Sequence, residues 1–355
     1  MILYKIILFP LSLLYAGIMW IRNLLYRLQI LPEQPFDFPL INVGNLSTGG
    51  TGKTPHVEYL VRLLSPHFHT ATLSRGYGRK SLGYLLADEN STAETIGDEP
   101  LQFHKKFKDL VVCVCEKRLL AIPLILFDRP FVQVLVMDDA FQHRSVKPGL
   151  NILLTTCDAP FYSDLILPSG NLREWPSAYH RAHVIVVTKC PPNLDKAGRD
   201  AIIQRIRPLP EQQVYFTSIT YGTPINAFTG EPLTDTKSRN ALVFSGIANP
   251  HPFEEHCDGI FKTTAHKSFG DHHRFDDSDI DDLIHRIKQN SEGSLLVCTE
   301  KDRMRLMHTA QEEKLKEVPL YYIPIEIAFL CDEEKFRTRV MDFVHSYDEP
   351  DSGAE

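Results

Sequence analysis

Short apolar runs alternate with helix-like segments along the chain from residue 38 onward. The runs are rich in Val, Ile and Leu and are too short for helices, which is typical of strands buried on both faces. After the first run, Val57, Leu60, Val61 and Leu64 follow the spacing of one helix face. We predict strands at 39–43, 69–74, 110–115, 131–139, 150–155 and 183–189. This alternation predicts an α/β fold with a mostly parallel sheet flanked by helices.

A second, shorter series follows residues 217–240, where Thr, Gly, Pro and Asn become frequent. These residues favour turns, so we interpret the stretch as a linker or a short hairpin. Beyond it, the pattern predicts two strands and one helix face, at 241–247, 294–299 and 280–287. The expected division is an amino-terminal helix over 1–31, a larger lobe over 32–220 and a smaller α/β lobe over 221–355, with a cleft between the lobes.

The amino-terminal stretch is the most apolar part of the chain. Residues 6–21 carry no charge, and this run of 16 residues is flanked by Lys5, Arg22 and Arg27. As a helix it would be roughly 24 Å long, which is short of the ~30 Å hydrocarbon core of a bilayer. A secretory signal is disfavoured because no A-x-A cleavage site follows, whereas a buried core helix stays open. We favour a helix that lies in or dips into the membrane surface.

A glycine-rich loop, GNLSTGGTGKTP, spans residues 44–55 between the first predicted strand and the first predicted helix. Its end fits the P-loop pattern G-x-x-x-x-G-K-[ST], although Ser47 stands where that pattern begins with glycine. Small residues let backbone N–H groups turn toward phosphates at a helix amino terminus. Lys53 can reach the β- and γ-phosphates, and the Thr54 hydroxyl can ligate magnesium. The predicted nucleotide site consists of Ser47, Thr48, Gly49, Gly50, Thr51, Gly52, Lys53 and Thr54.

Two adjacent carboxylates, Asp138 and Asp139, end an apolar run at VQVLVMDD. A P-loop protein needs an acid at the end of a neighbouring strand to hold its magnesium ion. Either residue fits that role, and the sequence does not choose between them. Guanine-specific proteins carry an N-K-x-D loop, but Pro191 follows Lys189 at that offset and Asp302 directly adjoins Lys301. We therefore expect ATP rather than GTP.

Composition narrows the class of protein and its compartment. The chain has 355 residues, enough for two domains, and a formal net charge of −7, which argues against a general nucleic-acid binder. Its seven cysteines include no CxxC pair, and Cys113 and Cys115 should point to the same face of one strand. We read these thiols as buried and structural and the compartment as cytosolic.

Seven motifs occur in an order that resembles one family, tetraacyldisaccharide 4′-kinase, the lipid A 4′-kinase of Gram-negative bacteria. They are GNLSTGGTGKTP, SRGYGR, GDEP, DDAFQHR, LPSGNLRE, FGDHHRF and TEKD, after an apolar amino terminus. The resemblance implies transfer of the γ-phosphoryl group of ATP to the 4′-hydroxyl of tetraacyldisaccharide 1-phosphate, which yields lipid IVA. It further implies a lipid acceptor, Mg²⁺, a place at the cytosolic face of the bacterial inner membrane, and neither nucleic acid nor a protein partner.

The resemblance also implies roles for individual residues. Lys53 is the P-loop lysine, and Asp98 of GDEP is the residue thought to activate the acceptor hydroxyl. His272 is thought to pair with Asp98, and Asp271, which precedes His272, is assigned to substrate binding. From the residues alone, Asp98 could instead cap a helix that starts near Pro100. Because His272 lies in the expected smaller lobe, the Asp98–His272 pair requires the two lobes to close.

Two arginines, Arg75 and Arg118, follow the second and third predicted strands. In α/β folds ligands bind at the carboxyl edge of the sheet, so these side chains can hold phosphates. Two other functions stay open. One is a P-loop NTPase that acts as an assembly or metal-delivery factor, and the other is a membrane-associated nucleotide sensor without catalysis. Turnover with a lipid acceptor discriminates the kinase from both.

Overall fold

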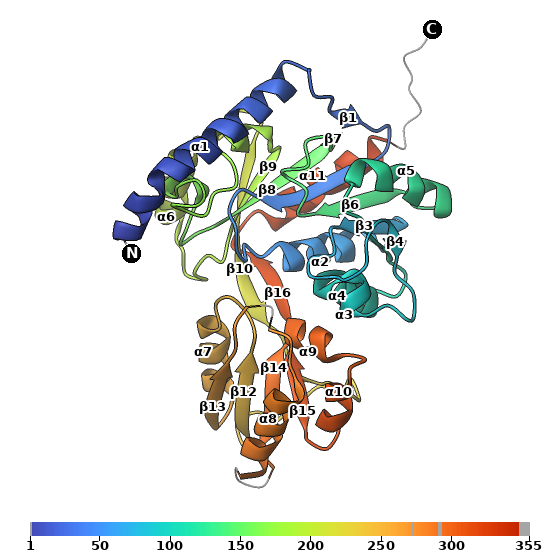
Figure 1. Ribbon diagram of the computed structural model, residues 1–355, viewed down its shortest axis with the longest axis vertical. Helices are drawn as coiled ribbons and strands as arrows, with labels where there is room; N and C mark the ends of the chain where they lie inside the picture. The colour runs from blue at the N-terminus through green and yellow to red at the C-terminus, as the bar shows by residue number, and fades with distance from the viewer. Residues whose placement is uncertain (1, 272, 290–292, 348–355) are drawn as a thin grey trace.

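The structure is a computed structural model that describes the backbone of residues 2–271, 273–289 and 293–347, with side chains from residue 7 onward. It forms two lobes joined by two strands, β10 (Gln213–Tyr221) and β16 (Ile325–Phe329), as Figure 1 shows. The larger lobe carries the amino-terminal helix α1 (Ile2–Arg27) on its outer side. The strands and helices predicted from the apolar pattern are confirmed within one or a few residues of their ends.

The larger lobe is built on a nine-stranded sheet in the order β16-β10-β9-β8-β2-β6-β3-β5-β4. Strands β10 to β5 in this order run parallel, and β16 and β4 are antiparallel edges, so the expected mostly parallel sheet is confirmed. Its other strands are β2 (Leu40–Asn45), β3 (Thr70–Ser74), β4 (Leu85–Leu86), β5 (Val111–Val114), β6 (Val134–Asp138), β8 (Leu150–Thr156) and β9 (Val184–Thr188). A separate two-stranded pair consists of β1 (Gln34–Pro35) and β7 (Val146–Lys147).

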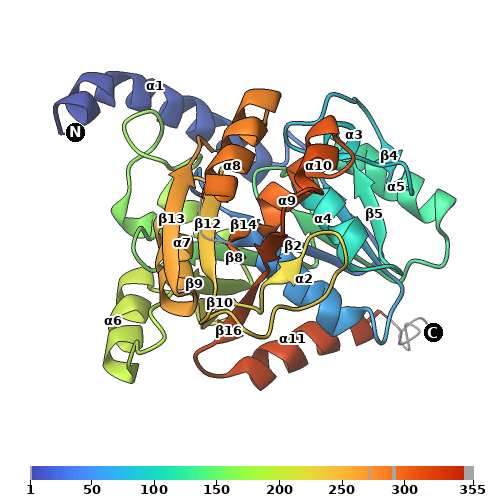
Figure 2. The same ribbon diagram turned by 90° about the horizontal axis from the view of Figure 1, so that it is seen from below.

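Helices cover both faces of this sheet because its central strands bury apolar side chains on both sides. On one face, Ile41 and Val43 pack against α2 and the carboxyl-terminal helix α11. On the other face, Leu40 packs toward α5, and Leu153 lies in a cluster with Ala16 of α1. Figure 2 shows α1 and α11 on opposite sides of the molecule. The helices are α2 (Lys53–Leu64), α3 (Ala93–Ile96), α4 (Asp98–Lys106), α5 (Arg118–Asp128), α6 (Lys196–Ile206) and α11 (Glu333–His345), with short 3₁₀ turns η1 (Phe161–Ser163) and η2 (Pro176–Arg181).

The smaller lobe is a five-stranded sheet in the order β11-β15-β14-β12-β13. Its strands are β11 (Ile225–Asn226), β12 (Asn240–Ser245), β13 (Thr263–Ser268), β14 (Leu295–Thr299) and β15 (Leu320–Ile323), and its helices are α7 (His251–Ile260), α8 (Asp277–Gln289), α9 (Glu300–Leu306) and α10 (Ala310–Leu315). The expected boundary near residue 220 stays a prediction. The pairing of β16 with β10, and the packing of α11 on the large sheet, return residues 325–345 to the larger lobe instead of leaving them in the smaller one.

Candidate active site

The phosphate loop lies between β2 and α2, in the order predicted from the sequence. Gly49 and Gly52 have φ angles of 100° and 86°, in the region that favours glycine. Asn45 at the end of β2 donates a hydrogen bond to the Thr51 hydroxyl (2.9 Å), and the Thr188 hydroxyl donates to the Thr51 carbonyl (2.8 Å). A Cβ at Gly49 would meet no atom within 4 Å. Hydrogen bonds to Thr51 therefore hold the loop on its buried side, while its outer side at Gly49 has no neighbouring atoms among the described residues.

Lys53 opens α2 and points toward the carboxylate of Asp139. Its Nζ lies 3.8 Å from Asp139 Oδ1 and donates to Asn45 Oδ1 at 3.5 Å. Arg173 approaches the same group, with Nη2 2.9 Å from Asp139 Oδ1, and also donates to Asn45 Oδ1. Burial acts to raise the pKa of Asp139, but the positive charges of Lys53 and Arg173 outweigh burial and lower it. Asp139 is therefore a carboxylate already paired with two cations.

Asp138, the last residue of β6, has the opposite surroundings. It is buried, and among the described residues its Oδ1 atom has no hydrogen-bond partner. Burial raises the pKa of Asp138 to about 7, and the negative charges of Glu99 and Asp139 add to this rise. A buried carboxylate oxygen without a partner is costly, so it invites a cation. The environment of Asp138 fits a divalent metal ion.

The two predicted arginines differ in exposure. Arg118 is buried at the start of α5, where its guanidinium donates to the Cys115 carbonyl and, at 3.1 Å, to the Asp138 carbonyl. Burial lowers the pKa of Arg118 to about 10. Arg75 is exposed at the end of β3, and its charge helps lower the pKa of His143 to about 4, after burial and Arg118. Arg118 thus stabilises the end of β6 through its hydrogen bond to the Asp138 carbonyl, whereas Arg75 is accessible from solvent.

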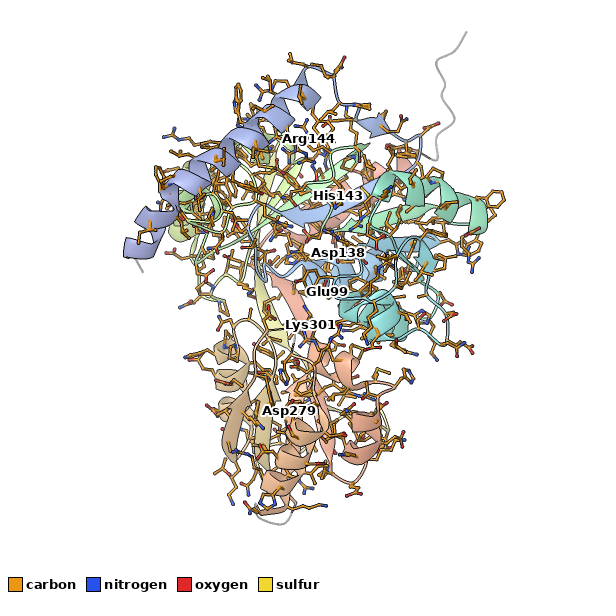
Figure 3. All side chains as sticks on the ribbon, in the orientation of Figure 1. Glu99, Asp138, His143, Arg144, Asp279 and Lys301 are labelled. Atoms are coloured by element: carbon orange, nitrogen blue, oxygen red, sulfur yellow. The ribbon has the colours of Figure 1, made fainter. Side chains whose placement is uncertain are left out.

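Asp98 and Glu99 begin α4, directly after Gly97, whose φ is 94°. Helix α9 of the smaller lobe contacts both acids. Arg305 Nε donates to Asp98 Oδ2 at 2.7 Å, and Lys301 Nζ donates to Glu99 Oε1 at 2.9 Å. Figure 3 shows Glu99 and Lys301 between the two lobes, with Asp138 nearby in the larger one.

Glu99 links α4 to the phosphate site. Burial acts to raise its pKa, but the charges of Lys301 and Lys53 and a hydrogen bond with the Thr54 side chain outweigh burial and lower it. Glu99 is therefore an ionised carboxylate within interaction range of the P-loop. The start of α4, the P-loop and the end of β6 form one site, at the carboxyl ends of the parallel strands.

The predicted partner of Asp98, His272, lies outside the described residues, so the Asp98–His272 pair stays a prediction. Asp271 beside it is exposed. The next residue, His273, stacks on Phe269 and approaches Asp279 Oδ2 at 2.6 Å. A Cβ built on Gly246 would lie 3.2 Å from His273 Cβ and 3.3 Å from Arg305 Nη1. The loop that carries Asp271 and His273 is thus adjacent to the arginine that contacts Asp98.

Sequence reasoning missed four polar residues of this site: Asn45, Glu99, Arg173 and Arg305. All four were in or close to recognised motifs: Asn45 belongs to GNLSTGGTGKTP, Glu99 to GDEP and Arg173 to LPSGNLRE, and Arg305 lies three residues after TEKD. A charged residue within a motif could therefore have indicated Glu99 and Arg173. Arg305 and Asp98 are 207 positions apart, and no local pattern predicts their contact.

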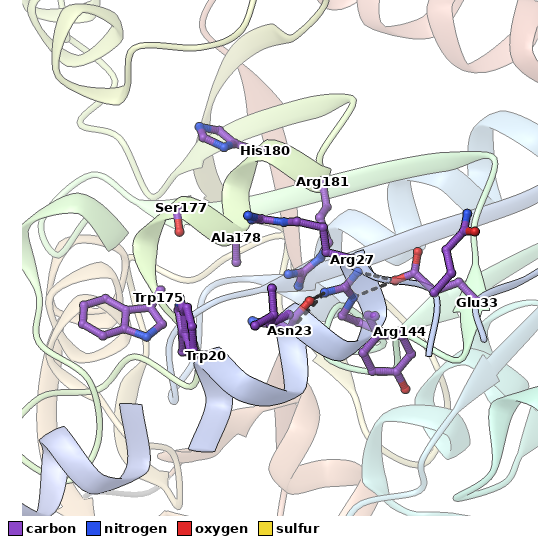
Figure 4. A pocket seen from close by; sticks show the side chains of 13 residues that line it. Trp20, Asn23, Arg27, Glu33, Arg144, Trp175, Ser177, Ala178, His180 and Arg181 are labelled. Carbon is purple, nitrogen blue, oxygen red and sulfur yellow. Dashed lines mark hydrogen bonds and ion pairs between the residues drawn. The ribbon is translucent and has the colours of Figure 1, made fainter. Parts of the chain in front are cut away.

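Two surface cavities lie away from the P-loop. One, of about 370 Å³, is formed by the second half of α1, the segment 175–181 and Arg144, as Figure 4 shows. Within it Arg144 donates to Glu33 at 2.7 Å and Arg181 to Glu174 at 3.0 Å. The other, of about 390 Å³, adjoins α5. Arg144 and Arg181 are thus paired with carboxylates, and Arg144 also donates to the Asn23 carbonyl of α1 at 3.3 Å, which helps hold this helix on the larger lobe.

The strand–loop–helix at residues 40–64, with carboxylates at the end of the adjacent strand β6, defines the chain as a P-loop nucleotide-binding protein of the α/β class. A family model, tetraacyldisaccharide-1-P 4′-kinase, matches residues 4–345. Tetraacyldisaccharide 4′-kinase of Flavobacterium johnsoniae is 43% identical over 349 residues, 98% of this chain and 99% of that protein. The enzyme of the same name from Bacteroides thetaiotaomicron is 41% identical over 352 residues, 95% of this chain and 92% of that protein.

A solved structure agrees with these relatives. The chain is similar to LpxK from Aquifex aeolicus in complex with ATP, with a TM-score of 0.75 and 28% identity over 96% of this chain and 99% of that one. The chain therefore belongs to the tetraacyldisaccharide-1-P 4′-kinase family. The family predicted from the seven motifs is confirmed.

Proposed function

We propose that this chain transfers the γ-phosphoryl group of ATP to the 4′-hydroxyl of tetraacyldisaccharide 1-phosphate and so forms lipid IVA in lipid A biosynthesis. The observation that carries the proposal is the family match over residues 4–345, in a chain whose phosphate loop has the Gly52-Lys53-Thr54 end of the P-loop pattern. Its relatives are named as this kinase, and the Aquifex aeolicus relative was solved with ATP. No observation favours an assembly or metal-delivery factor over this reaction.

The transfer itself requires positioning and charge stabilisation more than covalent help from the protein. In our proposal the backbone N–H groups of residues 47–54 hold the phosphates of ATP, and Lys53 lies against the β- and γ-phosphates. The 4′-oxygen forms a bond to the γ-phosphorus while the bond from phosphorus to the β–γ bridging oxygen breaks, which releases ADP. Asp98 accepts the proton of the 4′-hydroxyl as this exchange proceeds, and His272 orients Asp98.

We further propose that Thr54 and Asp138 hold a magnesium ion. Asp139 would not bind the ion but would hold Lys53 and Arg173 in place. Magnesium is usually bound by one or two carboxylates plus substrate phosphates. The described residues accordingly contain no cluster of three His, Cys, Asp or Glu side chains able to hold a metal unaided. When bound, the ion would neutralise charge on the β- and γ-phosphates. The partnerless Oδ1 of Asp138 supports this choice, because Asp139 already pairs with Lys53 and Arg173.

The lipid acceptor requires the enzyme to work at a membrane, and we propose the cytosolic face of the inner membrane, where ATP is present. In our proposal exposed Arg75 binds a phosphate of ATP or of the acceptor. Buried Arg118 maintains the shape of the site, and exposed Asp271 of the smaller lobe contacts the acceptor. Helix α1 supports the membrane assignment. It is long and apolar enough to cross a bilayer, yet it is docked along its length on the larger lobe. We therefore propose that it lies in the membrane surface.

The proposal is tested with Lys53→Met and Asp98→Asn in an assay of phosphate transfer to tetraacyldisaccharide 1-phosphate. Lys53→Met should abolish transfer, because it removes the cation that faces the phosphates. Asp98→Asn should lower kcat by about 10²–10⁴-fold and leave ATP affinity nearly unchanged. A variant that instead loses ATP affinity at normal kcat would assign Asp98 to helix capping.

A further inference from the structure

The last three residues of the TEKD motif begin α9, and the proposed chemistry assigns no role to this helix. Arg305 stands near the end of α9 with only 5% of its side chain exposed. Its guanidinium contacts both lobes: Nε donates to Asp98 Oδ2 at 2.7 Å, and Nη1 donates to the Gly246 carbonyl at 2.7 Å and to Asp302 Oδ1 at 2.8 Å. One rigid planar group therefore connects the proposed base in the larger lobe with two positions in the smaller one.

The smaller lobe holds Arg305 in place through Asp302. This carboxylate is fully buried, and its Oδ2 accepts hydrogen bonds from the Gly246 N–H (3.0 Å) and the Thr299 hydroxyl (2.6 Å). The Thr299 side chain in turn caps α9 by accepting from the Asp302 N–H at 3.1 Å. A Cβ at Gly246 would approach Asp302 Oδ1 to 3.1 Å and Arg305 Nη1 to 3.3 Å, so the cluster is close-packed. The guanidinium has little freedom to leave this position.

This arrangement differs from an ordinary ion pair at a lobe interface. Exposed pairs contribute little because both side chains are mobile and solvated. Here the side chains of Arg305, Asp302 and Asp98 are 5%, 0% and 17% exposed. Asp98 sits at the first residue of α4, where its rotamer decides which way the carboxylate faces. A donor held this firmly on Oδ2 fixes the orientation of the whole carboxylate.

We propose that Arg305 is a positioning residue, which orients the Asp98 carboxylate toward the acceptor hydroxyl when α9 packs against α4, with Asp302 and the Gly246 carbonyl as its frame. This inference rests on the proposed function, because it assigns the orientation of that reaction's base. It gives the smaller lobe a direct role in the chemistry: separation of the lobes would release Asp98 and switch transfer off. Misplacement of a reacting group by about 1 Å can cost about 10²-fold in rate.

The test compares Arg305→Met and Arg305→Lys with Arg286→Met, a control that removes an exposed arginine of α8 in the same lobe. Arg305→Met should lower kcat for lipid phosphorylation by about 10²-fold and change the KM for ATP by less than about twofold. Arg305→Lys should recover only part of the rate, because lysine keeps the charge but not the planar fork. The Tm of each variant is measured, and Arg305→Lys carries the test if Arg305→Met does not fold.

A double-mutant cycle asks whether Arg305 acts through Asp98. If it does, Arg305→Met should cost less than about threefold in the Asp98→Asn background, since contacting residues are strongly non-additive. Equal losses in both backgrounds, a normal kcat in Arg305→Met, or a higher kcat than wild type would each overturn the positioning role. An inactive wild type in the same assay would overturn the proposed function and this inference together. An active wild type with an unaffected Arg305→Met overturns this inference alone.

Discussion

At the residue scale, Asp138 and Asp139 show how neighbouring identical side chains acquire different chemistry. Asp139 has a φ of 50° and turns toward Lys53 and Arg173, whose charges keep it ionised. Asp138 ends a buried strand, and burial, with the charges of Glu99 and Asp139 adding to it, raises its pKa to about 7. One carboxylate is therefore satisfied by protein cations, whereas Oδ1 of the other has no hydrogen-bond partner among the described residues.

The two residues should respond differently to substitution. Asp138→Asn should raise the Mg²⁺ concentration needed for half-maximal transfer by about tenfold or more, because a neutral amide is a weaker ligand for a hard cation. Asp139→Asn is the matched control and should change this concentration by much less, while lowering kcat through Lys53. A magnesium titration of both variants measures the difference. Equal shifts in the two variants would refute the assignment of Asp138 as the ligand.

Residue types and spacing alone predicted the P-loop and the acids after β6, because these belong to a strand–loop–helix unit that is local in sequence. Arg173 and Arg305 could not be assigned in this way. Arg173 reaches the P-loop over 128 positions and Arg305 reaches Asp98 over 207, so their roles depend on how distant segments pack. The sequence also did not predict which arginine is exposed. Arg75 and Arg118 each follow a predicted strand, but Arg118 is buried and donates to two carbonyl groups.

At the element scale, α1 has two distinct faces. The face toward the protein is anchored by a hydrogen bond between the Ser12 and Ser169 hydroxyls (2.8 Å), by the buried Ala16, and by Asn23, which donates to Glu174 (3.0 Å). The outer face is an apolar stripe with three- and four-residue spacing. It consists of Ile7, Leu11, Leu14, Ile18 and Ile21, which are all more than half exposed. A wide exposed apolar stripe of this kind favours contact with lipid.

Polar substitutions on this stripe should weaken membrane binding. The double variant Leu14→Glu/Ile18→Glu removes two exposed side chains without touching the docked face, and it should reduce co-sedimentation with phosphatidylethanolamine–phosphatidylglycerol vesicles by at least about tenfold. Phe127→Glu on α5 is the control, since Phe127 is 82% exposed but lies on another helix. The Tm should stay near that of wild type. Unchanged co-sedimentation of the double variant would contradict the proposed role of α1.

At the scale of the whole molecule, the lobes are tied together by a buried charge cluster next to the site. Lys106 of α4 contacts Glu58 of α2 at 2.7 Å and Glu300 of α9 at 2.9 Å, and Gln102 donates to both carboxylates. One lysine thus serves two buried acids from different lobes. Burial, with Glu58 adding to it, raises the pKa of Glu300 to about 7.

Because the pKa of Glu300 is raised, the folding stability of the protein should depend on pH. Glu300 binds its proton more tightly in the folded protein than in the unfolded chain, so its contribution to stability is present at low pH and is lost as pH rises toward about 7. Glu300→Gln, which cannot ionise, should therefore gain Tm relative to wild type between pH 5 and pH 8, by about 2 °C or more. Glu317→Gln, at an exposed pair with Lys288, should show no such trend. A constant difference for Glu300→Gln would contradict this account.

The two-lobe arrangement was predictable in outline because two series of apolar strands flank a turn-rich linker. The return of β16 and α11 to the larger sheet was not, since an antiparallel edge strand has no local signal that names its partner. That return matters for function. It makes β10 and β16 a two-strand connection, so the smaller lobe and its α9 are held close to Asp98 and Glu99.

In our proposal this chain phosphorylates a lipid acceptor, and Asp98 is the base. The most direct measurement is transfer of label from γ-labelled ATP to tetraacyldisaccharide 1-phosphate in detergent micelles, with wild type and Asp98→Asn side by side. We expect the wild type to give a labelled lipid that carries a new 4′-phosphate, and the variant to lose about 10²–10⁴-fold of this activity. Hydrolysis of ATP by the wild type without any labelled lipid would contradict the claim.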